Sequence, residues 1–457
     1  MKKPQLLFLA LMLFLLPSVS AAQMFKGASD TTLSNGLKVI MLENHKAPLV
    51  SFQVWYRAGS RNERVGKTGL AHLLEHMMFK GTPKVSGEEF IRKIDENGGE
   101  ENAFTSHDFA AYFETLVSSR IDLPVTLESD RMSNLVLRES DFKTERQVVM
   151  EERRMRVEDS PQSFLMEQLD STAFQSQPYH RPVIGWTEDI ERLDLEDVQS
   201  FYSTYYNPAN AFIVVVGDFQ KDKLVPELEK AFGTIHGPPP RRRYLIQDPP
   251  QPGERTVKVE RPSQLGAVIA AYHVPNLRLP DAYVLEVIQA LLSGGKSSRF
   301  YEHLVRGKHL VLESDADYNL VSQDPGLFYV SASYLPGKDP AVVQKALYDE
   351  LELLKTTPVD PRELEKAKNQ LEVAFVMNQD SLFSLGLNLA EYEIALDWRA
   401  IGNYVPSVRS VSPQEIMRVA AKYFTPDNRT VGILVPTGPP EKTPPQPPGG
   451  MRGKVIR

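Results

Sequence analysis

The sequence contains no cysteine. This absence excludes disulfide bonds, cysteine nucleophiles, thiolate metal sites and a lipid-modified cysteine behind a leader segment. The chain also has no excess of positive charge, because 52 Lys and Arg face 59 Asp and Glu, for a net charge of −7. No overall positive field recruits nucleic acid or anionic lipid, so nucleic acid is not expected as a partner.

The apolar run near the N-terminus, from about 6 to 16, is too short for a comfortable membrane span, which needs roughly 20 residues. Two lysines precede this run, and a proline and small residues follow it. The pattern predicts a signal peptide over residues 1–22, cleaved after Ala21 or Ala22. We therefore expect a bacterial periplasmic or secreted protein with no stable membrane span after cleavage. An uncleaved anchor is the alternative.

The length of 457 residues predicts about two to three domains, and the chain repeats itself. Segment 195–219 matches segment 413–437 at a constant offset of 218 residues. Each copy reads as an amphipathic helix, a turn with Asn and Pro, and a β-rich run. Upstream, "APLVSFQVWYRAG" matches "PSQLGAVIAAYHV" at an offset of 214. Two related α/β units of roughly 200 residues are therefore expected in tandem.

The predicted units cover residues 26–236 and 255–437. Between them, residues 237–254, "GPPPRRRYLIQDPPQPGE", are rich in proline and arginine and predict an irregular linker. The tail 438–457 is rich in proline and glycine, which predicts disorder.

Segment 68–82, "TGLAHLLEHMMFKGT", predicts an amphipathic helix with about 100° per residue. One stripe, typical of a core face, consists of Leu70, Leu73, Leu74 and Met77. The nearly opposite stripe consists of His72, Glu75, His76 and Phe79. A solvated face more often carries Lys, Glu or Gln than two of the nine histidines of the chain. The second stripe therefore indicates that these residues have a functional role and do not simply form a solvated face.

Histidines at i and i+4 of a helix can place two imidazole nitrogens on one ion about 2.0–2.1 Å away. Glu75 at i+3 can reach a water bound to that ion. The order His-x-x-Glu-His is the reverse of the His-Glu-x-x-His helix known from zinc peptidases. In the second unit the equivalent positions hold Glu286, Gln289 and Ala290. The apolar packing stripe is present there too, as Val284, Val287, Ile288 and Leu291. The fold therefore does not require the two histidines.

Segment 141–159, "DFKTERQVVMEERRMRVED", predicts a second helix. One face of it carries Glu145, Val148, Val149 and Glu152. Buried carboxylates are costly unless they are paired or bound to metal. Beside the His helix, this face predicts a carboxylate as the third metal ligand. The alternative is a solvated charged helix with Glu–Arg pairs.

"HLLEH", followed some 75 residues later by "ERQVVMEE", resembles the pitrilysin or insulinase family of zinc metallopeptidases. Further similar segments are "GGEENAFTSHDFAAYFET", "YYNPANAFIVVVGDF" and "GGKSSRFYEHL". The resemblance extends from about residue 31 to 437 and fits the mitochondrial-processing-peptidase type of subunit. It implies an α+β fold with two tandem homologous units, each a mainly antiparallel sheet with helices packed on it. Such a chain forms half of a clam that encloses peptides.

By this resemblance, the chain is a zinc-dependent endopeptidase with one Zn²⁺ held by His72, His76 and Glu152. Glu75 matches the general base that takes a proton from the zinc-activated water. Glu145 matches a second carboxylate that supports the site from behind. Glu151 is the alternative third ligand, although it lies off the Glu145 face.

Residues 102–105 are expected to form an edge strand along which an extended peptide lies, contacted by Asn102 and Ala103. Active family members also use an Arg and, seven residues later, a Tyr from the second half of the clam. Arg306 matches the Arg, but Glu313 stands where the Tyr belongs. We therefore expect a second, similar subunit to supply the missing pair, with a homodimer as the alternative.

Two other functions compete with peptide hydrolysis. A non-catalytic scaffold or partner subunit of the same fold is the first, and the complete His/Glu set argues against it. The second is a protein that encloses peptides without cutting them.

Overall fold

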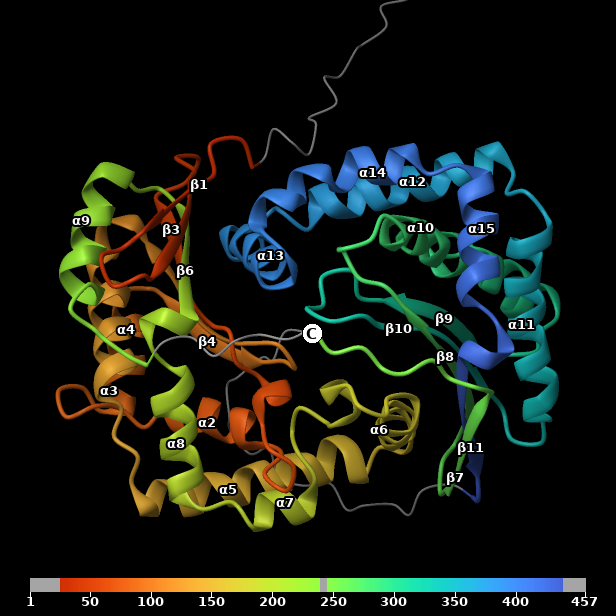
Figure 1. Ribbon diagram of the computed structural model, residues 1–457, viewed down its shortest axis with the longest axis horizontal. Coiled ribbons are helices and arrows are strands. Elements are labelled where there is room, and N and C mark those ends of the chain that lie inside the picture. Colours follow the sequence, from red (N-terminus) through yellow and green to blue (C-terminus); the bar gives the residue numbers. More distant parts are fainter. Residues whose placement is uncertain (1–24, 239–244, 439–457) are drawn as a thin grey trace, which may run out of the picture.

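The computed structural model describes residues 25–238 and 245–438, arranged as two sheets that face each other across helices (Figure 1). The predicted signal peptide lies outside the described residues, as does the predicted tail after Gly438. Among the described residues, no helix combines the length and apolar character that crossing a bilayer requires.

The first sheet has six strands in the order β1-β2-β6-β3-β5-β4. Only β2 and β6 pair in parallel within this sheet, and the other neighbours are antiparallel. Its strands are β1 (Ser29–Thr32), β2 (Lys38–Glu43), β3 (Leu49–Tyr56), β4 (Glu100–Thr105), β5 (Ala110–Val117) and β6 (Ala211–Gly217). Every residue of β6 is buried, as expected for the run "AFIVVVG" at the centre of a covered sheet.

The second sheet repeats this topology with five strands in the order β7-β11-β8-β10-β9. They are β7 (Arg255–Arg261), β8 (Gly266–Val274), β9 (Glu313–Tyr318), β10 (Gly326–Tyr334) and β11 (Arg429–Pro436). The parallel pair β7 and β11 is the equivalent of β2 and β6 in the first sheet. The predicted duplication and the mainly antiparallel sheets are therefore confirmed.

The helices also repeat in order between the two units. The first unit contains α2 (Leu70–Met78), α3 (Gly87–Glu96), α4 (Asp122–Asn134), α5 (Glu139–Arg153), α6 (Pro161–Ala173), α7 (Thr187–Glu191), α8 (Leu195–Tyr205) and α9 (Lys221–Phe232). The second contains α10 (Asp281–Ser293), α11 (Pro340–Thr356), α12 (Pro361–Met377), α13 (Leu382–Ala395), α14 (Tyr404–Ser410) and α15 (Pro413–Tyr423). Short turns of helix include η1 (Ser60–Asn62), η3 (Arg154–Glu158), η4 (Pro178–His180), η6 (Tyr301–Gly307) and η7 (Trp398–Asn403).

The two units exchange one helix each. Helix α6 of the first unit packs on β7, β8 and β11 of the second sheet, and α13 of the second unit packs on β3 and β6 of the first sheet. Leu165 and Leu169 of α6 are fully buried in one cluster with Ile269 and Leu434. The exchange is visible in Figure 1, where α13 lies beside the first sheet and α6 below the second. Each sheet thus buries its inner face under a helix of the other unit.

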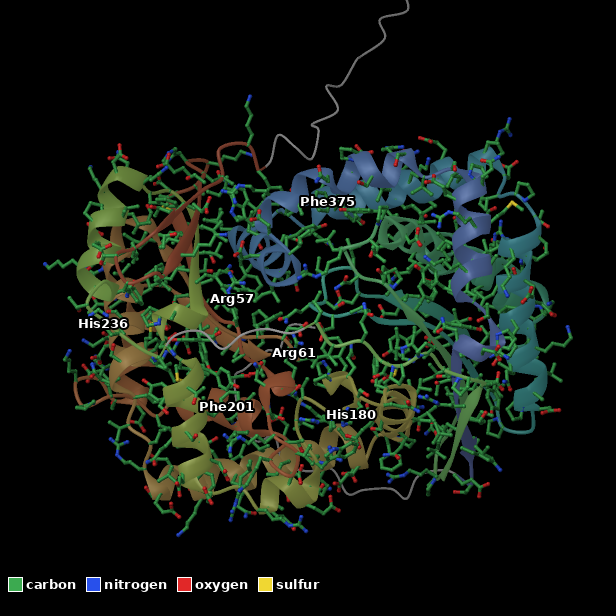
Figure 2. The ribbon with its side chains drawn as sticks, in the orientation of Figure 1. Arg57, Arg61, His180, Phe201, His236 and Phe375 are labelled. Carbon is green, nitrogen blue, oxygen red and sulfur yellow. The ribbon has the colours of Figure 1, made fainter. Side chains whose placement is uncertain are left out.

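Ion pairs reinforce this exchange at the junction between the units. Glu393 of α13 is buried and contacts Lys38 Nζ at 2.8 Å and Arg57 Nη2 at 2.5 Å, both on the first sheet side. Arg61 of η1 pairs with the fully buried Asp324, 2.5 Å away in the second unit. Figure 2 shows Arg57 and Arg61 on the side of the first unit that faces the second.

The predicted linker 237–254 has neither helix nor strand in its described residues. It is nevertheless anchored, because the Asp248 carboxylate accepts hydrogen bonds from the N–H groups of residues 175–177 at 2.6–2.8 Å. This contact lies directly after α6 and ties the linker to the exchanged helix.

Replacing Glu393 by alanine removes the carboxylate that pairs with the cationic groups of Lys38 and Arg57. We expect the free energy of unfolding to fall by about 2–3 kcal/mol, because removing one partner of a largely buried ion pair leaves charge without compensation. Calorimetry against wild type measures the change. Asp349→Ala is the matched control, since its i,i+4 pair with Lys345 is exposed and contributes less than about 1 kcal/mol. Equal losses of unfolding free energy in the two variants would contradict the role of Glu393 as a buried counter-ion.

Candidate metal centre

Helix α2 begins at a position that only glycine fits well. Gly69 has φ 85°, and a Cβ there would lie 2.6 Å from the carbonyl oxygen of Ile184. The buried Glu63 carboxylate caps the helix by accepting hydrogen bonds from the N–H groups of Gly69, at 3.1 Å, and Ala71, at 2.8 Å. Burial raises the pKa of Glu63 to about 8, although these two bonds oppose the rise. The cap fixes where α2 starts and therefore which way its functional face points.

The two faces of α2 divide as the sequence predicts. The buried residues of the helix are Leu70, Ala71, Leu73, Leu74, Met77 and Met78. His72, Glu75 and His76 are only partly buried. Helix α2 contacts both α5 and β4, so its polar face looks onto the carboxylate helix and the edge strand.

His72, His76 and Glu152 converge on one point. Glu152 Oε2 lies 3.8 Å from His72 Nε2 and 3.5 Å from His76 Nε2, and one ligand atom from each residue lies within 4.8 Å of the others. A tetrahedral ion about 2.0–2.2 Å from each ligand keeps such atoms about 3.3–3.6 Å apart. Two imidazoles and a carboxylate at this spacing fit the donor set of Zn²⁺ and leave a fourth position open.

Charged groups orient two of these three side chains, His76 and Glu152. Glu145 Oε2 lies 3.0 Å from His76 Nδ1, and its other oxygen lies 2.5 Å from Lys80 Nζ. Arg156 holds the second oxygen of Glu152 at 2.7 Å. The far nitrogen of His72, Nδ1, is buried and has no hydrogen-bond partner among the described residues. Glu145 thus fixes the tautomer of His76 in the way that supporting carboxylates do in zinc sites.

The pKa values show what charge the cluster favours. Burial and the neighbouring His76 lower the pKa of His72 to about 4. Burial opposes the charge of His76 as well, but its hydrogen bonds to Glu145 and Glu152 outweigh burial and raise its pKa to about 9. Burial opposes ionisation of Glu145 and Glu152 too, yet contacts with His76 lower the pKa of both carboxyls. The carboxylates therefore stabilise positive charge between the imidazoles, which a divalent cation supplies.

Glu75 lies beside the cluster and contacts the edge strand. Its Oε2 accepts a hydrogen bond from Thr105 Oγ1 at 2.5 Å. Burial raises the pKa of Glu75, and the Thr105 bond partly offsets the rise. Thr105 closes β4, so this one bond links the predicted general base to the predicted substrate strand.

Of the three predicted substrate contacts, Asn102 and Ala103 lie on the edge strand β4, and Arg306 lies away from the cluster. β4 is the edge strand of its sheet and pairs with β5, with Asn102 Oδ1 accepting from the N–H of Ala103 at 2.8 Å. Both residues line a cavity next to the site. Arg306 is different: it lies on η6 with 70% of its side chain exposed, and it pairs with Glu302 on the same helix. The structure does not bring Arg306 into the cluster.

Three contributors to the site were not foreseen from the sequence. Glu63 acts across a loop, and Thr105 is 30 residues from Glu75, so helical spacing reveals neither. Arg156 stands four residues after Glu152, and that i,i+4 spacing is the signal that could have indicated their pairing. Glu151, the alternative ligand, is 65% exposed and pairs with Arg154.

Known proteins share both the sequence pattern and the fold. Residues 38–186 match the family model described as insulinase (peptidase family M16), and residues 192–371 match the one described as peptidase M16 inactive domain. Zinc protease PqqE of Helicobacter pylori (strain ATCC 700392 / 26695) is 34% identical over 416 residues, covering 89% of this chain and 92% of that protein.

A solved structure and a plant relative extend the comparison. The crystal structure of a protease from Helicobacter pylori gives a TM-score of 0.86 at 32% identity and covers 90% of this chain and 99% of that chain. A probable mitochondrial-processing peptidase subunit beta of Arabidopsis thaliana is 25% identical over 426 residues, covering 89% of this chain and 78% of that protein. The insulinase match contains all of His72, Glu75, His76 and Glu152, whereas the second match, over residues 192–371, contains none of them.

The Glu152→Gln variant tests the ligand set. We expect its zinc affinity to fall by at least about a hundredfold, because a neutral amide replaces the charged ligand. Metal content after dialysis against a zinc buffer measures the loss. Glu151→Gln, one residue away on the exposed side, is the control and should bind zinc as wild type does. A normal zinc content in Glu152→Gln, or a loss in Glu151→Gln, would reverse the assignment.

Proposed function

Because the chain belongs to the insulinase family of peptidases, family M16, we propose that it is a zinc-dependent endopeptidase acting on peptides or small unfolded polypeptides. The observation that carries the proposal is the convergence of His72, His76 and Glu152 beside Glu75, at the end of an edge strand. Relatives named zinc proteases support the same chemistry.

The first unit supplies the groups that the reaction needs. Zinc bound by His72, His76 and Glu152 would polarise the scissile carbonyl and lower the pKa of water. Glu75 accepts the proton of the attacking water and returns it to the leaving amine. Because Thr105 donates a hydrogen bond to Oε2 of Glu75, we propose that the other oxygen, Oε1, accepts this proton. Glu145 keeps His76 in the tautomer that leaves Nε2 available as a ligand.

Strand β4 positions the peptide. Among the described residues, β5 lies on one side of β4 and no strand covers the other, so an extended peptide can add to that edge through backbone hydrogen bonds. We propose that Asn102 and Ala103 contact this peptide. Thr105 on the same strand then aligns the peptide backbone with Glu75.

A second subunit completes the proposed enzyme. Arg306 is exposed on η6 and has no contact with the cluster among the described residues, so it does not supply a cationic substrate clamp to this site. A relative named as a subunit, mitochondrial-processing peptidase subunit beta, supports assembly of such chains. We propose a heterodimer with a similar subunit, or else a homodimer, located in the periplasm or outside the cell.

The Glu75→Gln variant separates catalysis from binding. We expect it to keep one zinc per chain while peptide turnover falls by about 10²–10⁴-fold, since a general base has been lost from an intact metal site. A quenched-fluorescence peptide library and metal analysis give the two readouts, and a chelator should abolish wild-type turnover. Glu227→Gln on the exposed surface of α9 is the control. Unchanged turnover in Glu75→Gln would favour a scaffold or a peptide binder over an enzyme.

The requirement for a second subunit can be tested by measuring the rate of peptide cleavage per chain. We expect the purified chain, kept monomeric as judged by light scattering, to cleave slowly, and to reach its full rate with a co-purified similar subunit. In a homodimer the rate per chain would instead rise with protein concentration. A monomer that cleaves at a rate no partner or concentration increases would refute the requirement for a second subunit.

A further inference from the structure

The second unit contacts the loop in front of helix α2 through a buried ion pair. Arg61 of η1 pairs with Asp324, which lies on the connection between β9 and β10 of the second unit. The Asp324 side chain is fully buried, and only 7% of the Arg61 side chain is exposed. Among the described residues, the group able to hold a metal lies in the first unit. The pair therefore joins the unit without that group to the unit that has it.

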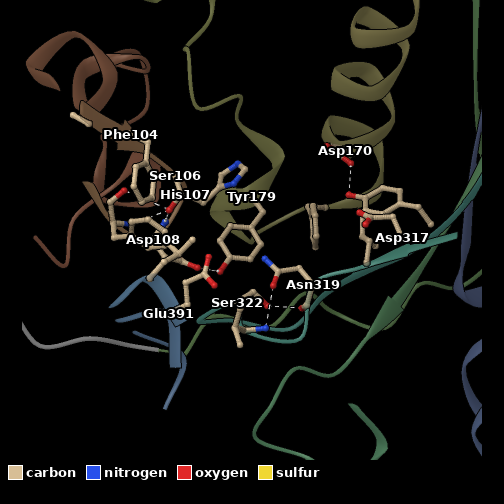
Figure 3. Close-up of a pocket in the computed structure, with 18 of the residues that line it drawn as sticks. Phe104, Ser106, His107, Asp108, Asp170, Tyr179, Asp317, Asn319, Ser322 and Glu391 are labelled. Atoms are coloured by element: carbon tan, nitrogen blue, oxygen red, sulfur yellow. Dashed lines mark hydrogen bonds between the residues drawn. The ribbon is translucent and has the colours of Figure 1, made fainter. Parts of the chain in front are cut away.

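Tyr179 and Asp108 extend this contact across the same boundary. The Tyr179 hydroxyl donates a hydrogen bond to Asp108 at 2.6 Å and accepts one from the N–H of Asp324 at 3.1 Å. Asp108 Oδ2 also accepts from the N–H of Gln323 at 3.0 Å, and its Oδ1 lies 3.7 Å from Arg61 Nε. Figure 3 shows the Tyr179 ring between Asp108 and the β9–β10 connection of the second unit. We call Arg61, Asp108, Tyr179 and Asp324 the boundary network.

The charged members of the boundary network are all buried. Oδ1 of Asp108 and Oδ1 of Asp324 have no hydrogen-bond partner among the described residues. The guanidinium of Arg61 therefore compensates both carboxylates. Because a buried charge without its partner is costly, a displaced member of the network leaves another member uncompensated. The network thus defines one position for each of its members.

Backbone contacts hold η1 against the turn that follows β4. The N–H groups of Ser60 and Arg61 donate to the carbonyl oxygens of Ser106 and His107 at 3.1 and 3.0 Å. A Cβ at Gly59 would lie 2.2 Å from the same Ser106 oxygen, so this approach requires glycine. The position of η1 is therefore coupled to the end of the edge strand β4.

The cap of helix α2 lies two residues beyond Arg61. Glu63 holds the first turn of the helix through the N–H groups of Gly69 and Ala71. Ala71 directly precedes His72, so the cap acts one residue away from a metal ligand. Successive Cα atoms are 3.8 Å apart, so the Cα atoms of Arg61 and Glu63 are separated by no more than about 7.6 Å. A displacement of Arg61 therefore reaches the cap through the backbone.

Arg181 provides a second connection from the boundary network to the cap. Its Nη1 donates a hydrogen bond to the backbone oxygen of Glu63 at 2.9 Å. Arg181 directly follows η4, the turn that carries Tyr179. Glu63 is thus held by two segments that contact the second unit, η1 through Arg61 and η4 through Tyr179.

We propose that the second unit positions the metal-binding helix through the boundary network, with Arg61, Tyr179 and Asp324 as positioning residues for the zinc site. The proposal rests on the zinc site of the proposed function and adds to it a task for the second unit. Ligand atoms bind one ion well only when each distance is within about 0.2 Å of its usual value. A small rotation of α2 about its capped end would move His72 and His76 by more than that.

The Arg61→Met and Asp324→Asn variants test the ion pair. We expect each to weaken zinc binding about tenfold, as for outer groups that orient metal ligands. The affinity is measured on the full chain by competition for zinc with a chromogenic chelator. The double variant should bind zinc within about threefold of the weaker single variant, because both changes remove the same interaction. Additive losses would mean that the two residues act separately, and would overturn the proposal.

Glu393→Ala is the matched control, because it breaks another ion pair between the units. Glu393 contacts Lys38 and Arg57 and acts on the first sheet instead of η1. We expect this variant to lose stability yet to bind zinc within about twofold of wild type. An equal loss of zinc affinity in Glu393→Ala would show that any weakening of the boundary disturbs the site, and the proposal would be wrong. Unchanged zinc affinity in Arg61→Met and Asp324→Asn would also refute it.

Amide hydrogen exchange of the zinc-free chain gives a readout that needs neither metal nor substrate. The N–H groups of Gly69 and Ala71 should exchange about tenfold faster in Arg61→Met, because the start of α2 opens locally when its cap is displaced. Mass spectrometry of peptides from this segment measures the rates. Glu393→Ala should exchange there as wild type does, and the same acceleration in both variants would contradict the proposal.

If Arg61→Met does not fold, Tyr179→Phe takes its place, since it removes a single hydroxyl from the network. It should change zinc affinity and exchange by about threefold in the same directions, and wild-type values of both would refute the proposal. Neither readout depends on peptide hydrolysis. A chain that binds zinc in an Arg61-dependent manner but cuts no peptide supports the boundary network and contradicts the proposed endopeptidase. A chain that cuts peptides while all variants bind zinc as wild type does is a peptidase without this positioning role.

Discussion

The functional site depends on one contact, the packing of α2 against α5, which sets two imidazoles against two carboxylates. Each of these groups is costly to remove from water, and the contacts between imidazole and carboxylate lower that cost. The contact requires both helices to be aimed correctly. Glu63 caps α2 from one side, and on the other the buried Arg153 anchors the end of α5 to Glu167 at 2.8 Å. Neither anchor belongs to the cluster, yet the geometry of the cluster depends on both.

The sequence predicted features that repeat along a single element. The stripes of α2, the Glu145–Glu152 face of α5 and the duplicated helix–turn–strand follow from spacing alone, because neighbours on one element are fixed by its geometry. The adjacent residues Glu151 and Glu152 illustrate this, since one residue of helical rotation sends the first to solvent and the second to the cluster. The cap by Glu63, the Thr105–Glu75 bond and the position of Arg306 depend on loops and on tertiary packing, which spacing does not encode.

The second unit shows what happens to the same framework without the histidines. Helix α10 keeps its buried stripe, and Glu286 stands where the first unit has His72. Burial raises the pKa of Glu286 to about 7, and the Tyr404 hydroxyl donates to it at 3.1 Å. A polar group therefore persists in the equivalent place, within a cavity of its own.

The exchange of α6 and α13 bears on how such a chain arose. Each of these helices stands two helices before the end of the same repeated pattern, α6 before α8 and α13 before α15, and each covers the sheet of the other unit. Two identical copies that exchange an equivalent element form a domain-swapped dimer. The exchange costs little, because each copy makes the same contacts with its own element before the exchange. The present chain has the architecture of such a swapped dimer joined by a linker. The two halves of the present chain are unequal, because among the described residues only the first carries a cluster such as that of His72, His76 and Glu152.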